Sequence, residues 1–238
     1  MEQESISLNK YISDTGLCSR RGADVLIEEG KVTINGIVAR KGNRVSPSDQ
    51  VHIDGELIGD KPDVVYLIYN KPTGITCTTD SGDPDNIIDH LKYPERIFPV
   101  GRLDKMSQGL LLLTNNGDIV NKILRAGNQH EKEYIVIVNQ PIDTAFIKSM
   151  STGVPILETV TQPCKVIKID DYTFNIVLTQ GLNRQIRRMC EYLGYHVRKL
   201  TRVRIMHLTL DNLPNDTWRY ITKKEEEKMM DIVKDSRG

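Results

Sequence analysis

The stretch Val100-Gly101-Arg102-Leu103-Asp104-Lys105-Met106-Ser107-Gln108-Gly109-Leu110-Leu111-Leu112-Leu113-Thr114-Asn115 places an acidic residue shortly before an apolar run. The four consecutive leucines predict a buried strand. Asp104 lies between two basic residues, and a carboxylate beside an arginine keeps its negative charge. Such a group suits a nucleophile or a base, and no neighbouring Asp or Glu offers the second carboxylate that glycosidases require. The residues alone leave open that Asp104 is a turn residue or an ion-pair partner.

Around this stretch, predicted strands and helices are mixed without a regular strand–helix–strand repeat. A polar loop is expected at residues 78–86. Gly194 fits the end of a helix. Strands are predicted at residues 64–69, 110–113, 134–138, 174–178 and within 196–210, and helices at 118–125 and 182–193. The mixture favours an α+β fold with a mixed, mostly antiparallel sheet.

The first sixty residues form a module of their own. Two short helices are predicted over residues 6–29, and Ser19 can cap the second helix. Short strands follow at 32–34, 37–38 and 51–53, and Asn35-Gly36 is a strong hairpin-turn signal. Lys61-Pro62 indicates a linker. We therefore expect a front module at residues 1–62, a body at residues 63–222, and a charged tail at residues 223–238 that forms a solvated helix or a frayed end.

Composition is that of an ordinary globular protein, but the charges are unevenly spread. The 238 residues are 39% apolar and 27% charged, which excludes a wholly disordered or collagen-like chain. Lys and Arg number 32, as do Asp and Glu, and a formal net charge of zero does not by itself indicate a nucleic-acid partner. Residues 184–204, however, contain seven basic residues and one acid, a local charge of +6. Local fields steer polyanions, so this window predicts a phosphate-tracking groove, although a solvated helix face is the alternative.

Metal, redox and membrane chemistry find no support in the sequence. The four cysteines form no C-x-x-C pair, and the five histidines lack metal-ligand spacing. No apolar run approaches the roughly 20 residues of a membrane helix, and the start of the chain does not resemble a signal peptide. We expect four reduced structural thiols in a cytoplasmic protein.

Five motifs, in order along the chain, resemble those of the RNA pseudouridine synthases that carry an N-terminal S4 domain. The G-R-L-D-x-x-S-x-G-L-L-L-L-T-N run from Gly101 resembles the catalytic motif of that family. The others are the S4-like residues 8–53, the N-K-P-x-G entry at Asn70, the K-x-Y motif at Lys132 and the G-x-N-R-Q-I-R-R-M helix from Gly181. The resemblance implies a small S4 α-L module followed by a mixed-sheet catalytic domain. Within the family, the chain looks most like the F-type synthases of 23S ribosomal RNA.

The resemblance also implies a reaction and the residues that perform it. The N1–C1′ bond of a uridine is broken, the base is turned, and C5 is joined to C1′, an isomerisation that requires no cofactor and no metal. Asp104 is then the essential carboxylate, acting by covalent attack or by removing a ribose proton. Arg187 matches the basic residue that holds this carboxylate ionised and oriented, and Tyr134 matches the aromatic that packs against the flipped base. Plain strand packing for Tyr134 and an exposed position for Arg187 are the alternatives.

Further residues are expected to contact RNA. Leu103 and Ile186 wall the pocket, and Arg102 fills the gap left by the extruded base or contacts phosphate. From the basic window we expect Arg184, Arg188, Arg202 and Arg204 to face the RNA. In the S4-like module the expected contact positions are Ser19, Arg20, Arg21, Lys31 and Asn35. Contacts of these residues with the RNA backbone would add affinity without reading the bases. Protein docking is an alternative role for this module.

The expected function is therefore the conversion of one uridine of 23S ribosomal RNA to pseudouridine by a monomer, with tRNA as a second substrate to consider. A non-catalytic S4-type RNA-binding or ribosome-assembly factor is the alternative. A methyltransferase is poorly supported, because no glycine-rich nucleotide-binding turn follows a strand.

Overall fold

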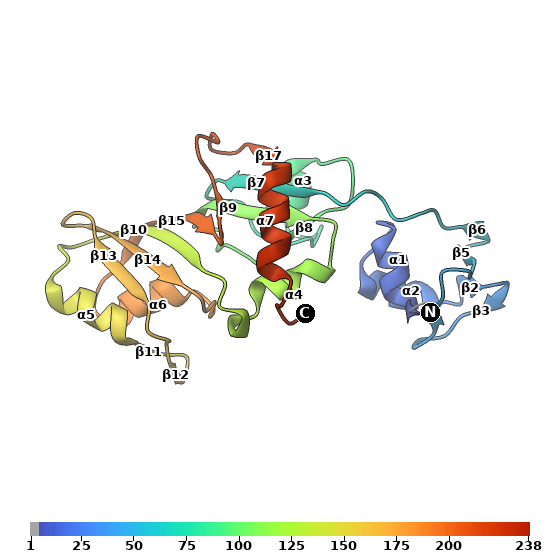
Figure 1. The fold of residues 1–238 in the computed structure, drawn as a ribbon, viewed down its shortest axis with the longest axis horizontal. Coiled ribbons are helices and arrows are strands. Elements are labelled where there is room, and N and C mark those ends of the chain that lie inside the picture. The colour runs from blue at the N-terminus through green and yellow to red at the C-terminus, as the bar shows by residue number, and fades with distance from the viewer. Residues whose placement is uncertain (1–4) are drawn as a thin grey trace. The chain divides into compact units, whose positions relative to one another are not determined.

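The computed structural model describes residues 5–238, which divide into two compact units (Figure 1). The first unit contains the described residues up to Val65 together with Tyr93–Arg96 and Asn115–Gly117. The second contains Tyr66–Lys92, Ile97–Thr114 and Asp118–Gly238. Each unit is built around its own buried apolar residues.

The first unit packs two helices against short strands. The helices predicted over residues 6–29 are confirmed, and the Ser19 hydroxyl accepts a hydrogen bond from the backbone N–H of Gly22, as a helix cap should. Asn35 and Gly36 both have positive φ, 51° and 81°, the conformation of a tight hairpin turn. The elements are β1 (Ile6–Ser7), α1 (Leu8–Asp14), α2 (Arg20–Glu28), β2 (Val32–Ile34), β3 (Ile37–Val38), β4 (Arg44–Val45), β5 (Val51–Ile53) and β6 (Glu56–Leu57).

The second unit is organised by a nine-stranded sheet. Its main path runs β13-β14-β10-β15-β9-β7-β17, and β16 and β8 pair with β15 and β9. Its first elements are β7 (Tyr66–Lys71), α3 (Ile87–Leu91), β8 (Phe98–Val100), β9 (Gln108–Thr114), α4 (Asp118–Leu124), the 3-10 turn η1 (Ala126–Asn128), β10 (Lys132–Val138) and α5 (Thr144–Thr152). The remainder are β11 (Pro155–Ile156), β12 (Thr159–Val160), β13 (Lys165–Lys168), β14 (Thr173–Leu178), α6 (Gln185–Tyr192), β15 (Val197–Ile205), β16 (Leu208–Thr209), β17 (Trp218–Tyr220) and α7 (Lys223–Val233).

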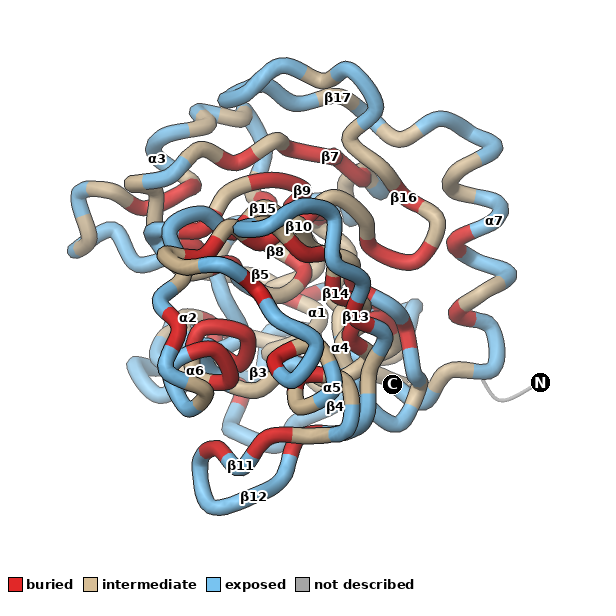
Figure 2. Tube along the Cα trace, turned by 90° about the vertical axis from the view of Figure 1, so that its left-hand side faces the viewer, coloured by how far each residue is buried: buried red, intermediate tan, exposed pale blue. Residues whose placement is uncertain are grey.

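The predicted α+β fold with a mostly antiparallel sheet is confirmed. Every strand pair of the large sheet is antiparallel except β15 with β9. One apolar cluster joins α5 and α6 to β10 and β14, and another joins α4 and α7 to β7 and β9. These helix pairs lie at different ends of the sheet in Figure 1, and the buried residues follow its central strands in Figure 2.

The parallel seam between β15 and β9 depends on one glycine. Gly109 pairs with Arg202 and has φ +105°. A Cβ atom built on Gly109 would lie 2.2 Å from the carbonyl oxygen of Arg202, far inside van der Waals contact. Only glycine allows the two backbones to approach so closely, which explains why a glycine introduces the leucine run.

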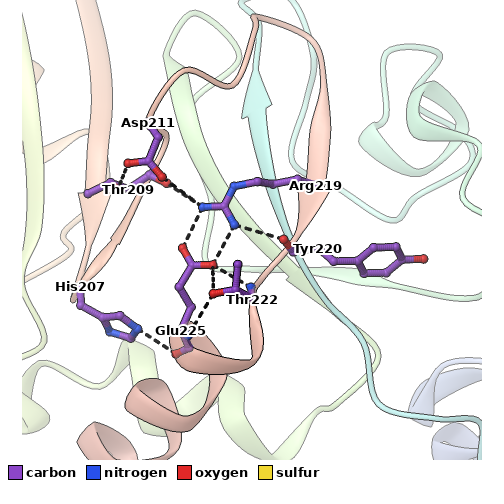
Figure 3. Close-up of polar contacts among 7 residues, drawn as sticks. All are labelled: His207, Thr209, Asp211, Arg219, Tyr220, Thr222 and Glu225. Atoms are coloured by element: carbon purple, nitrogen blue, oxygen red, sulfur yellow. Dashed lines mark hydrogen bonds and ion pairs between the residues drawn. The ribbon is translucent and has the colours of Figure 1, made fainter.

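The C-terminal segment differs from its expected form as a solvated helix or frayed end. Residues 223–233 form α7, and Met229 and Val233 are buried in the cluster with β7 and β9. At its start, Thr222 and Glu225 form a capping box, and both terminal nitrogens of Arg219 donate hydrogen bonds of 2.8 Å to Glu225 (Figure 3). The charged composition concealed two apolar residues four positions apart, which is enough to bury one face of a helix.

Candidate active site

A pocket opens in the second unit where three parts of the chain meet. The loop before β9 contributes Arg102, Leu103, Asp104 and Ser107. The strands contribute Tyr134 from β10, Leu178 from β14 and Leu200 from β15, and the segment that leads into α6 contributes Gln180, Gly181, Leu182, Arg184, Gln185, Ile186 and Arg187. The predicted catalytic residues Asp104, Tyr134 and Arg187 therefore line one cavity.

Asp104 is placed at this pocket with a side chain that is 33% exposed. Its Oδ2 atom lies 3.5 Å from Nε of Arg187 and 3.9 Å from Nη1 of Arg184. Its own carbonyl accepts a hydrogen bond of 2.9 Å from the N–H of Ser107, which closes a turn ahead of β9. The carboxylate therefore faces two guanidinium groups, which favour this orientation of its side chain.

Arg187 fixes the loop as well as the carboxylate. The side chain is only 10% exposed, and Nη2 donates to the carbonyl of Met106 at 3.0 Å and to the hydroxyl of Ser107 at 3.1 Å. Its Nε atom is buried without a hydrogen bond and points toward Asp104 at ion-pair distance. Arg187 is thus a buried, multiply bonded side chain, which differs from an exposed arginine of a solvated helix face.

Lys71 supports the same loop and had no role in our sequence interpretation. It is fully buried, and its Nζ donates to the carbonyls of Pro72 at 2.7 Å and Ser107 at 2.9 Å. Burial lowers the pKa of Lys71, while the nearby charge of Asp104 acts in the opposite direction. A signal was available in the sequence, since Lys71 lies two residues after the apolar run at residues 64–69 and within the N-K-P-x-G motif, and buried lysines need partners.

Apolar side chains form part of the pocket wall beside its charged and polar residues. Leu103 and Ile186 are 6% and 5% exposed, and both line the cavity as expected. Tyr134 lines it from β10 and packs against the apolar cluster of α5 and α6. A second polar residue that we had not singled out, Gln185, accepts a hydrogen bond from the N–H of Leu182 and orders the segment before α6.

The basic window 184–204 does not form one continuous groove. Arg102 is exposed at the pocket. Arg184 is exposed at the N-terminal cap of α6, and Arg188 is half-buried on that helix. Arg202 departs from the expected RNA contact, because it is 3% exposed and its Nε donates to the carbonyl of Leu110 at 2.7 Å. Arg204 also differs from the expectation that it contacts RNA.

Arg204 is held by acids instead of being available to phosphate. Its Nη2 lies 2.9 Å from Oε2 of Glu131, and its Nε lies 2.6 Å from Oε2 of Glu133. The hydrogen bond from Arg204 lowers the pKa of Glu133 below its ordinary value. Sequence alternation placed Arg202 and Arg204 on one face of a strand, but it could not show that neighbouring strands cover one side chain and neutralise the other.

In the first unit, the five expected contact residues are all exposed. Ser19 serves as the cap of α2, which begins with Arg20 and Arg21. Lys31 forms an ion pair of 2.8 Å with Glu29. The side chain of Asn35 is occupied within the module, donating to Asp49 at 2.8 Å and accepting from the N–H of Gln50 at 2.9 Å, so its first role is to hold the turn.

Metal-ligand clusters and helices of membrane-spanning length are absent from residues 5–238. Within that range no group of three His, Cys, Asp or Glu side chains could hold a metal ion, and the four cysteines are free thiols. None of the helices described there is long and apolar enough to cross a membrane.

Comparisons with known proteins identify the family to which the chain belongs. Residues 65–192 match the family described as RNA pseudouridylate synthase, and residues 7–51 match the S4 domain. The chain is 52% identical to the dual-specificity RNA pseudouridine synthase RluF of Escherichia coli strain K12 over 99% of this chain and 82% of that protein. It is 36% identical to the ribosomal large subunit pseudouridine synthase B of Bacillus subtilis strain 168 over 93% of this chain and 94% of that protein. A crystal structure of a pseudouridylate synthase superimposes with a TM-score of 0.70 at 29% identity, covering 94% of this chain and all of that one.

Proposed function

The chain belongs to the RNA pseudouridylate synthase family and is an RNA pseudouridine synthase with an S4 domain, and from this premise we propose that it isomerises one specific uridine of 23S ribosomal RNA. One relative supports this substrate, since it is named for the large ribosomal subunit, and another is named for dual specificity. Dual specificity is consistent with a second RNA substrate, and we propose a tRNA for that role. We further propose that the protein acts as a monomer in the cytoplasm.

The observation that carries the proposal is the Asp104–Arg187 ion pair of 3.5 Å inside a pocket that Tyr134, Leu103 and Ile186 also line. We propose that the target uridine leaves its stack and enters between Tyr134, Leu103 and Ile186. Arg102, exposed at the same pocket, would occupy the gap in the RNA or contact phosphate. We also propose domain boundaries near residues 62 and 222, with α7 beyond the second boundary packed against β7 and β9.

Asp104 then acts on the ribose or on the base. In the reaction the N1–C1′ bond breaks, C5 bonds to C1′, the proton on C5 leaves, and N1 takes up a proton. Asp104 contributes either as a covalent nucleophile or as the base that removes a ribose proton, and both roles need the ionised carboxylate that Arg187 orients. The Tyr134 hydroxyl is proposed to relay the proton from C5.

The test measures release of tritium from RNA labelled at C5 of uridine, because that hydrogen is lost when C5 bonds to C1′. Wild-type protein should release tritium from 23S RNA, and Asp104→Asn should abolish release while RNA affinity is unchanged. Asp85→Asn is the matched control, since Asp85 is an exposed carboxylate paired with Lys105 at 2.6 Å. Turnover by Asp104→Asn would refute the mechanism, and RNA binding by wild-type protein without turnover would favour an assembly factor.

A pseudouridine map of ribosomal and transfer RNA, made with and without the protein, identifies the substrate. Tyr134→Phe separates packing from proton relay. Removal of the hydroxyl should lower kcat by about 100-fold if it relays the proton, with KM unchanged because the ring is retained.

A further inference from the structure

The outward face of α6 presents three side chains spaced four residues apart, namely Arg184 at the cap, Arg188 and Tyr192. Residues at this spacing lie along one stripe of a helix, and the three span about 12 Å at 1.5 Å per residue. The opposite face of the helix is buried through Ile186, Met189 and Cys190. The stripe is therefore held on a rigid, well-packed element.

The stripe begins at the active-site pocket. Arg184 lines the cavity, its side chain is 45% exposed, and its Nη1 is 3.9 Å from Asp104. Arg184 also has φ +51°, a left-handed conformation that a non-glycine residue rarely adopts. This conformation lies at the point where the chain turns from the pocket rim into the helix.

Arg188 is ordered without being neutralised. Its Nε donates to the carbonyl of Asn183 at 3.1 Å, and its Nη2 donates to the side-chain oxygen of Asn183 at 3.2 Å. Among residues 5–238 no carboxylate lies within ion-pair distance of Arg188, although exposed Glu191 follows three positions later on the helix. A guanidinium fixed by neutral partners keeps its full charge for an anion.

Tyr192 ends the stripe with an aromatic ring in solvent. It is 61% exposed, the highest fraction among the aromatic side chains in the described part of the chain. Surfaces that bind single-stranded nucleic acid combine basic side chains along the backbone with aromatic rings on which bases stack. Arg184, Arg188 and Tyr192 supply this combination in one line from the pocket.

We propose that this α6 stripe binds the single-stranded RNA flanking the flipped uridine, with Arg184 and Arg188 on successive phosphates and an unpaired base stacked on the Tyr192 ring. The proposal rests on the proposed function, because it assumes an RNA substrate in the pocket. Stacking is tolerant of base identity, so the stripe would fix the position of the RNA and leave its sequence to be selected elsewhere.

The experiment uses the full chain with two RNAs. One is the RNA fragment that the wild-type protein modifies, and the other is a short single-stranded RNA containing 2-aminopurine, whose fluorescence is quenched on stacking. Tyr192→Ala should raise KM about 10-fold with kcat unchanged and should abolish quenching in the bound short RNA. Tyr192→Phe keeps the ring and should behave as wild type.

Tyr172→Ala is the matched control, because Tyr172 is 46% exposed in the turn between β13 and β14 and does not line the pocket. Arg188→Gln should lower the slope of log affinity against log salt by about 0.7, the value for one phosphate on single-stranded RNA. If Tyr192→Ala and Tyr172→Ala had the same KM and the same quenching, the proposal that the α6 stripe binds RNA would be wrong. Wild-type protein that quenches the short RNA but modifies no RNA would refute the proposed function and leave the stripe standing.

Discussion

Replacing Gly109 with alanine should push β9 away from β15, the parallel strand pair of the large sheet. β9 and β15 pair through Gln108 with Thr201 and through Gly109 with Arg202. An alanine Cβ would lie 2.2 Å from the Arg202 carbonyl oxygen and 2.8 Å from its nitrogen. Both clashing atoms belong to backbone, so no side-chain rotation relieves the overlap, and β9 must move away from β15 by roughly 1 Å.

The energetic cost follows from three contributions. A non-glycine residue held at the φ of +105° costs roughly 1–3 kcal/mol. The hydrogen bonds beside the clash weaken, at about 0.5–1.5 kcal/mol each. Buried leucines of β9 also lose part of their packing, so we expect a total of about 3–5 kcal/mol. For a chain of this size that lowers Tm by about 10 °C.

Gly109→Ala should also lower the catalytic rate under conditions where the protein remains folded. Asp104 precedes β9 on one side of the seam, whereas Tyr134 and Arg187 belong to β10 and α6 on the other side. A displacement of about 1 Å between reacting groups costs roughly 100-fold in rate. Gly109→Ala should therefore have kcat about 100-fold lower at a temperature where it remains folded.

The assay pairs calorimetry with tritium release, measured well below the Tm of both proteins. Gly127→Ala is the control, because a Cβ at Gly127 meets no atom within 4 Å and the residue lacks a positive φ. It should match wild type in both measurements. If Gly109→Ala shared the Tm and kcat of Gly127→Ala, the seam would not govern the site and the reasoning would be wrong.

Two other predictions concern buried and half-buried charges. Arg187→Lys should lower kcat by about 100-fold and Tm by several degrees, because one ammonium cannot replace the bonds that this guanidinium makes to the Met106 carbonyl and the Ser107 hydroxyl while facing Asp104. Unchanged kcat in a steady-state assay would contradict the positioning role. The hydrogen bonds from Arg219 lower the pKa of Glu225 from 4.5 to about 2, so this carboxylate stabilises the fold above pH 4.5 and loses its contribution as pH falls toward 2. The Tm difference between wild type and Glu225→Gln should be largest at neutral pH and vanish near pH 2, and a difference that persists there would exclude this linkage.

Local signals in the sequence predicted part of the secondary structure of both units, whereas α3, α5, β8 and β17 were not predicted. The Asn35-Gly36 turn and the cap at Ser19 depend on residues within a few positions of each other, and the leucine run needs only a buried strand. The pairing of β9 with β15 was not predictable in this way. It joins distant segments, and its one local trace is a glycine whose reason becomes visible only when Arg202 is placed against it.

The candidate site likewise contains residues that the sequence identified and residues that it did not. Asp104 stands out because of its charge and its place before a strand, and resemblance supplied its partner Arg187. Lys71 was missed because lysines are usually exposed, and its three carbonyl acceptors, those of Pro72, Lys105 and Ser107, are brought together by the loop. A lysine at the end of a buried strand can therefore indicate a loop whose backbone carbonyls accept hydrogen bonds from its ammonium group.

The burial of Arg202 and the pairing of Arg204 change what the basic window predicts about RNA affinity. Seven cations in residues 184–204 suggest seven phosphate contacts, but Arg187, Arg202 and Arg204 are occupied within the protein. At about 0.7 per phosphate, the remaining four would contribute a slope near −3, not near −5, in a plot of log affinity against log salt. Because the S4 unit adds contacts of its own, the informative quantity is the change on substitution. Arg204→Gln should leave the slope as it is in wild type, whereas Arg188→Gln reduces it, and equal reductions in the two variants would mean that Arg204 leaves its glutamates to bind RNA.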